Sequence, residues 1–172
     1  TILFPSVESY ESARTHRGVT YGRSGTPTTY AFEEAMAALD HAHRAIALAS
    51  GKAAINLTLA ALTQRGDHIL VVDTAYGPTR HFCDTTLARF GVETTYYDPA
   101  VGAGIDSLIR NETKLILLEA PGSLTFEMQD VPAIAAVARK RGVLTAIDNT
   151  WATPLLFKPL DPHLLLSKVE VF

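Results

Sequence analysis

Three groups that could bind a ligand or take part in chemistry lie near the ends of apolar runs in this sequence: a Ser-Gly-Lys turn, a tyrosine and a carboxylate. Ser50-Gly51-Lys52 comes directly before a helical run, Tyr76 comes shortly after one apolar run, and Asp148 ends another. Glycine at a helix N-terminus lets backbone amides bind an anion such as phosphate. An aromatic face stacks on a planar ligand, and a buried carboxylate needs a charged or hydrogen-bonded partner. Together these groups predict a site for a planar ligand that carries a phosphate and a protonated ring nitrogen.

Two better-known phosphate-binding motifs do not match this sequence. A Walker loop would need glycine at Ile46 and a hydroxyl residue at Ala53, and a dinucleotide fingerprint would need its third glycine at Ser107. Pyridoxal phosphate instead matches the predicted partners, because its phosphate is cradled, its ring stacked and its nitrogen held by an aspartate. Ser123, in the polar turn after another apolar run, adds a hydroxyl.

Each of these features also has an ordinary structural interpretation. The Ser-Gly-Lys turn could be a plain strand–helix connection, Tyr76 a half-buried surface tyrosine, and Asp148 a cap for the amides that follow it. The segment that contains Ser123 could be an ordinary turn whose polar residues serve only the turn itself. Only their occurrence together favours a ligand site.

The elements that would position these groups alternate between strands and helices. The predicted strands are Ala45–Ala49, His68–Asp73, Val92–Tyr97, Lys114–Glu119 and Val143–Asp148. The predicted helices are Thr29–Asp40, Lys52–Arg65, Thr79–Phe90 and Val131–Arg141, with C-caps at Gly66, Gly91 and Gly142 and an N-cap at Asp130. This alternation, with several strands that are almost continuously apolar, predicts an α/β fold with a mostly parallel sheet and helices on both faces. Ligands of such sheets bind beyond the carboxyl ends of the strands.

Composition bounds the remaining possibilities. The 172 residues are 47% hydrophobic and 19% charged, with a formal net charge of −3, so one domain is expected and a nucleic-acid partner is not. The single cysteine, Cys83, cannot form an internal disulfide and favours a reducing, cytoplasmic location. We expect no membrane span, because an uninterrupted apolar run of about 18 residues is absent, and no metal site.

Four ordered motifs carry a resemblance to a known family: Tyr21–Thr28 (YGRSGTPT), Ser50-Gly51, Asp73–Thr79 (DTAYGPT) and Asp148–Pro154 (DNTWATP). Over Phe4–Leu160 the chain resembles the Cys/Met-metabolism (trans-sulfuration) family of pyridoxal-phosphate enzymes. The segment Gly122–Glu127 is most similar to the bacterial cystathionine β-lyase branch, whereas the synthase and γ-lyase branches usually have an asparagine-proline pair there.

This resemblance implies a fold-type I (aspartate aminotransferase-like) large domain, with its mostly parallel sheet between two helical layers. It divides the chain into an N-terminal arm over residues 1–27, a cofactor-binding domain over 28–160 and a divergent tail over 161–172, without the C-terminal small domain. The complete enzyme would be a homodimer or homotetramer. Tyr21 and Arg23 would bind the cofactor phosphate of a neighbouring subunit.

The resemblance also implies the other site roles. Gly51 and the Lys52 amide would bind the phosphate, and Tyr76 would stack on the ring with its hydroxyl near the reacting groups. Asp148 would pair with the ring nitrogen, with Thr150 nearby, and Ser123 would lie near the ring hydroxyl. Lys52 itself departs from the family, which usually has an apolar residue at this position.

The implied reaction is β-elimination of L-cystathionine to homocysteine, pyruvate and ammonia. The family's Schiff-base lysine is expected beyond Phe172, and Lys168 does not fit its pattern. The alternatives are an inactive or vestigial cofactor-binding domain, a cystathionine γ-synthase or γ-lyase relative, and a nucleotide-binding α/β module, which the failed phosphate motifs disfavour.

Overall fold

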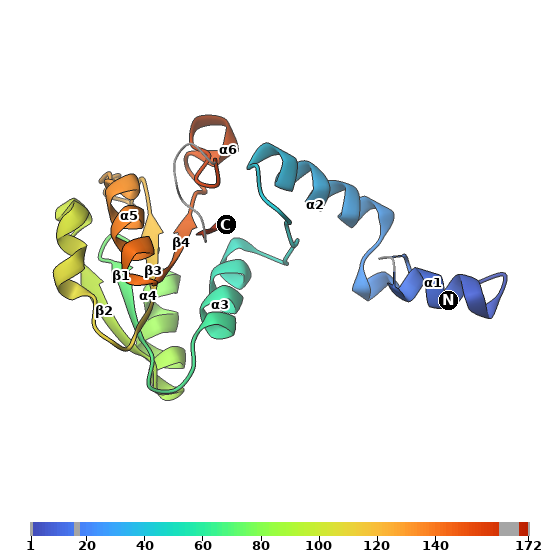
Figure 1. The fold of residues 1–172 in the computed structure, drawn as a ribbon, viewed down its shortest axis with the longest axis horizontal. Coiled ribbons are helices and arrows are strands. Elements are labelled where there is room, and N and C mark those ends of the chain that lie inside the picture. Colours follow the sequence, from blue (N-terminus) through green and yellow to red (C-terminus); the bar gives the residue numbers. More distant parts are fainter. Residues whose placement is uncertain (1, 16–17, 162–168, 172) are drawn as a thin grey trace. The chain divides into compact units, whose positions relative to one another are not determined.

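The computed structural model describes residues 2–15, 18–161 and 169–171 and divides into two compact units. The first unit is Thr1–Ala47 and the second is Leu48–Phe172. The second unit holds the sheet (Figure 1). Lys168, which does not fit the pattern of the family's Schiff-base lysine, lies outside the described residues.

The first unit is helical. It contains α1 (Val7–Thr15), the 3-10 turn η1 (Gly22–Ser24) and α2 (Pro27–Leu39). Helix α1 lies within the segment predicted to be an N-terminal arm, where the sequence analysis predicted no helix, and no residue of that helix is buried. Helix α2 begins two residues before its predicted start, because the Thr26 hydroxyl accepts from the Thr29 amide at 3.3 Å in a reciprocal capping box.

The predicted strand Ala45–Ala49 does not form. In this segment the Ala47 amide donates to the Glu33 carboxylate at 2.8 Å instead of to a neighbouring strand. None of its five residues is buried. Alanine-rich sequence has weak strand preference and gives a sheet little to bury, so the apolar character of this run was misleading.

The sheet of the second unit is parallel throughout, in the order β2-β1-β3-β4-β5. Its strands are β1 (His68–Val72), β2 (Glu93–Tyr97), β3 (Thr113–Glu119), β4 (Leu144–Asp148) and β5 (Val169–Val171). The first four confirm the predicted strands to within one residue at each end. The fifth lies in the segment predicted to be a divergent tail, where the sequence indicated no strand.

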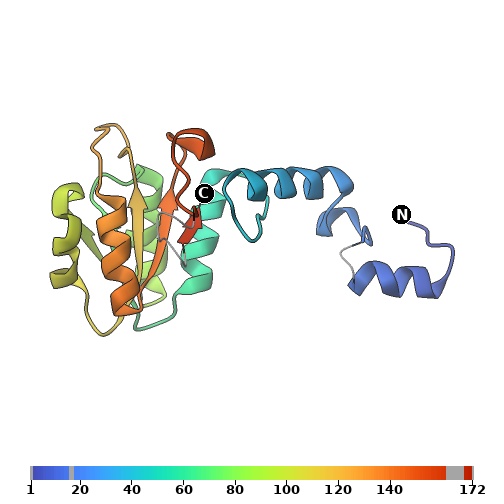
Figure 2. The ribbon, with the colours of Figure 1, turned by 45° about the horizontal axis from the view of Figure 1, so that its top comes forward.

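Helices cover both faces of this sheet, and the predicted three-layer α/β fold is confirmed (Figures 1 and 2). Helices α3 (Gly51–Leu62) and α4 (Gly77–Phe82, continued by a π-helical turn over Cys83–Leu87) lie on one face. Helix α5 (Val131–Arg141) and the 3-10 segment η3 (Pro99–Leu108) lie on the other. All five residues of β1 are buried, as expected for a central strand covered on both sides.

The predicted helix ends were mostly right. Asp130 caps α5 by accepting the Ala133 amide at 3.0 Å, and Gly142 ends this helix in the left-handed region with φ 71°. Gly91 has φ 80° and closes the helical run after α4. Gly66 does not cap α3, because that helix ends at Leu62. A short final helix, α6 (Thr153–Leu156), follows β4. Among the helices described, none has the length and apolar character to cross a membrane.

A buried histidine lies at the amino-terminal end of the parallel strands. His68 begins β1, and its ring nitrogens lie 2.8 Å from the Thr113 hydroxyl and 2.9 Å from the Thr95 hydroxyl. Burial lowers the pKa of His68, the positive charge of Arg110 acts in the same direction, and Glu93 and Glu112 oppose it. The fold therefore favours the neutral imidazole.

We predict that this histidine makes the free energy of unfolding depend on pH. Because the folded state binds the imidazole proton less tightly than the unfolded chain, stability should fall as pH drops below the ordinary histidine pKa of 6.5. His68→Asn removes the titration, so its free energy of unfolding should fall less steeply between about pH 7 and about pH 5, measured by urea denaturation. Parallel pH profiles for the two proteins in that range would contradict the prediction.

Candidate active site

The carboxyl ends of three neighbouring strands bring most of the predicted site residues to one edge of the sheet. Strand β1 leads to Tyr76, β3 to Ser123, and β4 to Asp148 and Thr150. The three strands pair side by side, with β3 in the middle, so these segments share one edge. This is the edge at which parallel α/β sheets bind ligands.

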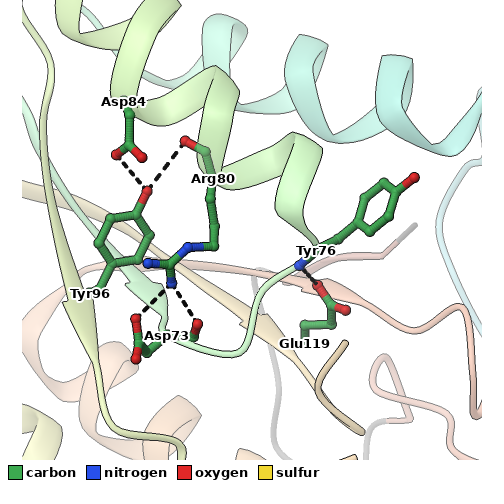
Figure 3. Close-up of polar contacts among 6 residues, drawn as sticks. All are labelled: Asp73, Tyr76, Arg80, Asp84, Tyr96 and Glu119. Atoms are coloured by element: carbon green, nitrogen blue, oxygen red, sulfur yellow. Dashed lines mark hydrogen bonds and ion pairs between the residues drawn. The ribbon is translucent and has the colours of Figure 1, made fainter. Parts of the chain in front are cut away.

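Tyr76 lies at the turn between β1 and α4. Its backbone is held by a hydrogen bond, whereas its ring is not buried. Its amide donates a 2.7 Å hydrogen bond to Oε2 of Glu119 at the end of β3. The residue is 46% exposed, and the ring leaves the turn on the side away from Glu119 (Figure 3). A ring held in this way can present a face to a planar ligand.

A second anchor holds the start of the same turn. Nη1 of Arg80, on α4, donates to the Asp73 carboxylate at 2.7 Å and to the Asp73 carbonyl at 2.5 Å (Figure 3). The guanidinium also lies over the ring of Tyr96, with its central carbon 3.9 Å from the ring centroid. The Tyr96 hydroxyl in turn donates to Asp84 at 2.7 Å. The turn that carries Tyr76 is therefore fixed at both ends.

Asp148 presents a carboxylate at the end of β4. One of its oxygens, Oδ1, accepts the Thr150 amide at 3.0 Å, so the capping interpretation holds for that atom. Within the described part of the chain, Oδ2 has no hydrogen-bond partner, which leaves it available to a ligand. The next residue, Asn149, is buried and donates to the Phe157 carbonyl at 3.0 Å, which fixes the chain beyond the strand.

The turn before α3 has the features of an anion site. Ser50 is the N-cap, and its hydroxyl accepts the Ala53 amide at 3.1 Å. The amides of Gly51 and Lys52 come earlier in the first turn, where a helix supplies no internal acceptor. A Cβ placed on Gly51 would meet nothing within 4 Å, so the space above this turn is open. The Lys52 residue is exposed.

The loop that carries Ser123 is joined to the turn that carries Tyr76. The Ser123 amide donates to the Thr74 carbonyl at 2.8 Å, and the Gly122 amide donates to the Glu127 carbonyl at 2.9 Å. Gly122 lies so close to Thr74 that a Cβ on the glycine would be 2.5 Å from the threonine hydroxyl. These contacts set the position of Ser123 relative to the tyrosine.

Tyr21 and Arg23 belong to the first unit. Both are exposed, and the Arg23 guanidinium lies 5.0 Å from the centroid of the Tyr21 ring. Their predicted role concerns a neighbouring subunit, so it remains a prediction.

The sequence analysis missed Glu119 as a site residue. This glutamate is 5% exposed and its Cα pairs with that of Asp148 across β3 and β4. The pKa of Glu119 is raised to about 7, chiefly by burial and to a smaller extent by the charge of Asp148, while the Tyr76 and Ser123 amides act to lower it. The available signal was that Glu119, like Asp148, is an acidic residue that ends an apolar run. Among the described residues, no three metal-binding side chains gather into a metal site.

Comparison with known proteins decides the family. The sequence model of the family described as Cys/Met metabolism PLP-dependent enzyme matches residues 1–164. The chain belongs to this family. The match confirms the resemblance seen in the sequence, and pyridoxal phosphate is the cofactor of the family. It also removes the alternative of a nucleotide-binding module.

The relatives of this chain within the family include cystathionine β-lyases. A Rhizobium johnstonii protein, provisionally named cystathionine beta-lyase, is 55% identical over 161 residues, which are 94% of this chain and 40% of that protein. The Escherichia coli cystathionine beta-lyase MetC is 39% identical over 166 residues, or 94% of this chain and 42% of its own length. The chain therefore spans about two-fifths of the length of these relatives.

Solved structures place the chain in the fold-type I class that the resemblance implied. The crystal structure of cystathionine gamma-lyase from Lactobacillus plantarum complexed with L-serine matches with a TM-score of 0.83 and 37% identity. The match covers 94% of this chain and 40% of the Lactobacillus chain. The relatives of this chain thus include both a β-lyase and a γ-lyase.

Proposed function

We propose that the protein catalyses β-elimination of L-cystathionine, releasing homocysteine, pyruvate and ammonia. The observation that carries this proposal is the edge of the sheet where Tyr76, Ser123 and Asp148 meet beyond three adjacent strands. The β-lyase names of the Rhizobium and Escherichia relatives favour the β rather than the γ reaction.

The residues present fit pyridoxal phosphate. The open space above Gly51, with the amides of Gly51 and Lys52 at the start of a 12-residue helix, suits the phosphate. The half-exposed ring of Tyr76 suits the face of a pyridine ring. The Asp148 carboxylate suits a protonated ring nitrogen, because a charged hydrogen-bonding partner strengthens such a contact.

Each of these residues then has a defined task. When bound, the cofactor supplies an electron-withdrawing ring that stabilises negative charge at the substrate Cα. Asp148 would hold the proton on the ring nitrogen, and the Thr150 amide supports its carboxylate. Tyr76 would stack on the ring with its hydroxyl near the reacting groups, and Ser123 would lie near the ring hydroxyl. Gly51 and the Lys52 amide would hold the phosphate.

We also propose that the active form is a homo-oligomer of the cytoplasm. In it, Tyr21 and Arg23 of one subunit would bind the phosphate held by its neighbour, for which the arginine fork is well suited. The exposure of both residues, together with the absence of any buried residue in α1, supports an arm that packs on something outside its own unit.

A γ-elimination is the second candidate, and the Lactobacillus γ-lyase match favours it. The two reactions cleave different carbon–sulfur bonds of the same substrate. β-Elimination leaves homocysteine and pyruvate, whereas γ-elimination leaves cysteine and 2-oxobutyrate.

The products of the full-length protein with pyridoxal phosphate and L-cystathionine separate these candidates. We expect pyruvate and homocysteine in equal amounts, measured by chromatography of the oxo acids and thiols. Formation of 2-oxobutyrate with cysteine would instead show the γ reaction. Bound pyridoxal phosphate without either product would support the alternative of an inactive cofactor-binding protein.

A further inference from the structure

Glu119 is a buried acidic side chain at the site edge that has no task in the proposed reaction. It ends β3, the middle of the three strands that carry the site, and its Cα pairs with that of Asp148 on β4. An acidic group in a buried position is costly unless its hydrogen bonds are satisfied. Its contacts therefore indicate what it does.

The carboxyl group of Glu119 accepts a hydrogen bond from the turn that carries Tyr76. Its Oε2 accepts the Tyr76 amide at 2.7 Å, a contact that joins residues 43 positions apart in the chain (Figure 3). The contact crosses from the end of β3 to the loop after β1. It is thus a direct link between the strand beside Asp148 and the residue proposed to stack on the cofactor.

The backbone of Glu119 is itself held by a buried polar chain. The Gln129 side-chain amide donates to the Glu119 carbonyl at 2.7 Å, and the Tyr97 hydroxyl donates to Oε1 of Gln129 at 2.8 Å. Gln129 is 7% exposed and Tyr97 2% exposed. A glutamate anchored in this way can act as a rigid support rather than as a mobile surface group.

We propose that Glu119 is a positioning residue that ties the Tyr76 turn to the Asp148 end of the sheet, so that the tyrosine ring and the aspartate carboxylate keep a fixed spacing. The inference rests on the proposed roles of Tyr76 and Asp148. It adds that their alignment depends on a third residue, which does not touch the cofactor.

The electrostatics of the pair agree with this role. Of the described charged groups, Asp148 on β4 is the one that raises the pKa of Glu119, in addition to burial, and the Tyr76 and Ser123 amides act in the opposite direction. A carboxyl oxygen accepts the Tyr76 amide whether or not the group is protonated, so the link to the turn does not require a charged Glu119.

Two substitutions separate positioning from charge. Glu119→Gln keeps an oxygen acceptor for the Tyr76 amide, whereas Glu119→Ala removes it. In the full-length protein, amide hydrogen exchange of the peptide containing Tyr76 should be near wild type in E119Q and about 10-fold faster in E119A, as expected for the loss of one hydrogen bond. The affinity for pyridoxal phosphate, followed by the absorption of the bound cofactor, should fall about 10-fold in E119A and less than about 3-fold in E119Q.

Glu112→Ala is the matched control, because Glu112 is an exposed glutamate just before β3, at the end of that strand away from the site. It should leave both measurements unchanged. Faster exchange over the whole sheet in E119A, with no excess at Tyr76, would show a merely structural role and overturn the inference. Equal loss of cofactor affinity in E119Q and E119A would overturn it too, since the charge and not the hydrogen bond would then be needed.

The inference and the proposed function can fail separately. If the wild-type protein does not bind pyridoxal phosphate, the proposed function fails, and the exchange of the Tyr76 amide in E119A still decides whether Glu119 holds the turn. If the wild-type protein binds and E119A binds equally well with unchanged exchange, the role of Glu119 is refuted and the proposed function stands.

Discussion

Asp148→Ala should weaken the binding of pyridoxal phosphate by about 10- to 150-fold and reduce lyase activity to background. The expected affinity loss follows from the hydrogen bond between a carboxylate and a protonated ring nitrogen, because a bond to a charged group contributes about 1.5–3 kcal/mol. The activity falls further, since without the aspartate the ring nitrogen loses its proton and with it the power to stabilise negative charge at the substrate Cα. Cofactor absorption and pyruvate release measure the two effects.

Asp148→Asn separates the charge of this residue from its shape. The asparagine can still accept the Thr150 amide that Oδ1 accepts at 3.0 Å, so the backbone after β4 should keep its position. We expect the asparagine variant to unfold like the wild type and yet to lose most of its activity. Full turnover in either variant would remove Asp148 from the mechanism.

The sheet could be predicted from the sequence because its central strands are buried on both faces. Runs such as His68–Val72 and Thr113–Glu119 are almost continuously apolar, and the structure buries nearly every residue in them. A strand that is covered on both faces has no solvent-facing side, so its sequence does not need to alternate between apolar and polar residues. Composition and length alone were therefore sufficient for β1, β3 and β4, whereas β2, with only Tyr97 buried, followed from the alternation of strands and helices.

The errors have a different physical origin. Ala45–Ala49 is apolar but mostly alanine, which contributes little buried surface, and the Ala47 amide is taken by Glu33. Helix α1 has no buried residue, so it lacks the apolar stripe that makes a helix recognisable in a sequence. In both segments, composition was a poor guide to local structure.

The site was only partly predictable for a related reason. Tyr76, Ser123 and Asp148 each follow a predicted strand, so the rule that ligands bind at the carboxyl ends of strands was enough to group them. The role of Glu119 depends on strand order and register, which place it opposite Asp148 and within reach of a turn 43 residues away. Spacing along the chain does not reveal such a contact.

Gly122→Ala should disrupt the same site through packing. A Cβ at this position would lie 2.5 Å from the Thr74 hydroxyl and 2.6 Å from the Thr74 Cβ, which is closer than real Cβ contacts allow. Since the Ser123 amide bonds to the Thr74 carbonyl, separating the two loops would move Ser123 away from the Tyr76 turn. We expect the free energy of unfolding to fall by about 1–3 kcal/mol, as for other overpacked positions, together with a loss of cofactor affinity.

Second substitutions at Thr74 test whether the collision is the cause. In the G122A background, Thr74→Ala should give little relief because its Cβ remains 2.6 Å from the new methyl group, whereas Thr74→Gly removes that atom. The Thr74 hydroxyl is buried without a hydrogen-bond partner in the described part of the chain, so its removal should carry little penalty of its own. Thr74→Gly should therefore restore part of the cofactor affinity lost in G122A. If Thr74→Ala restored as much as Thr74→Gly, contact with the Thr74 Cβ would not be what excludes a side chain at Gly122.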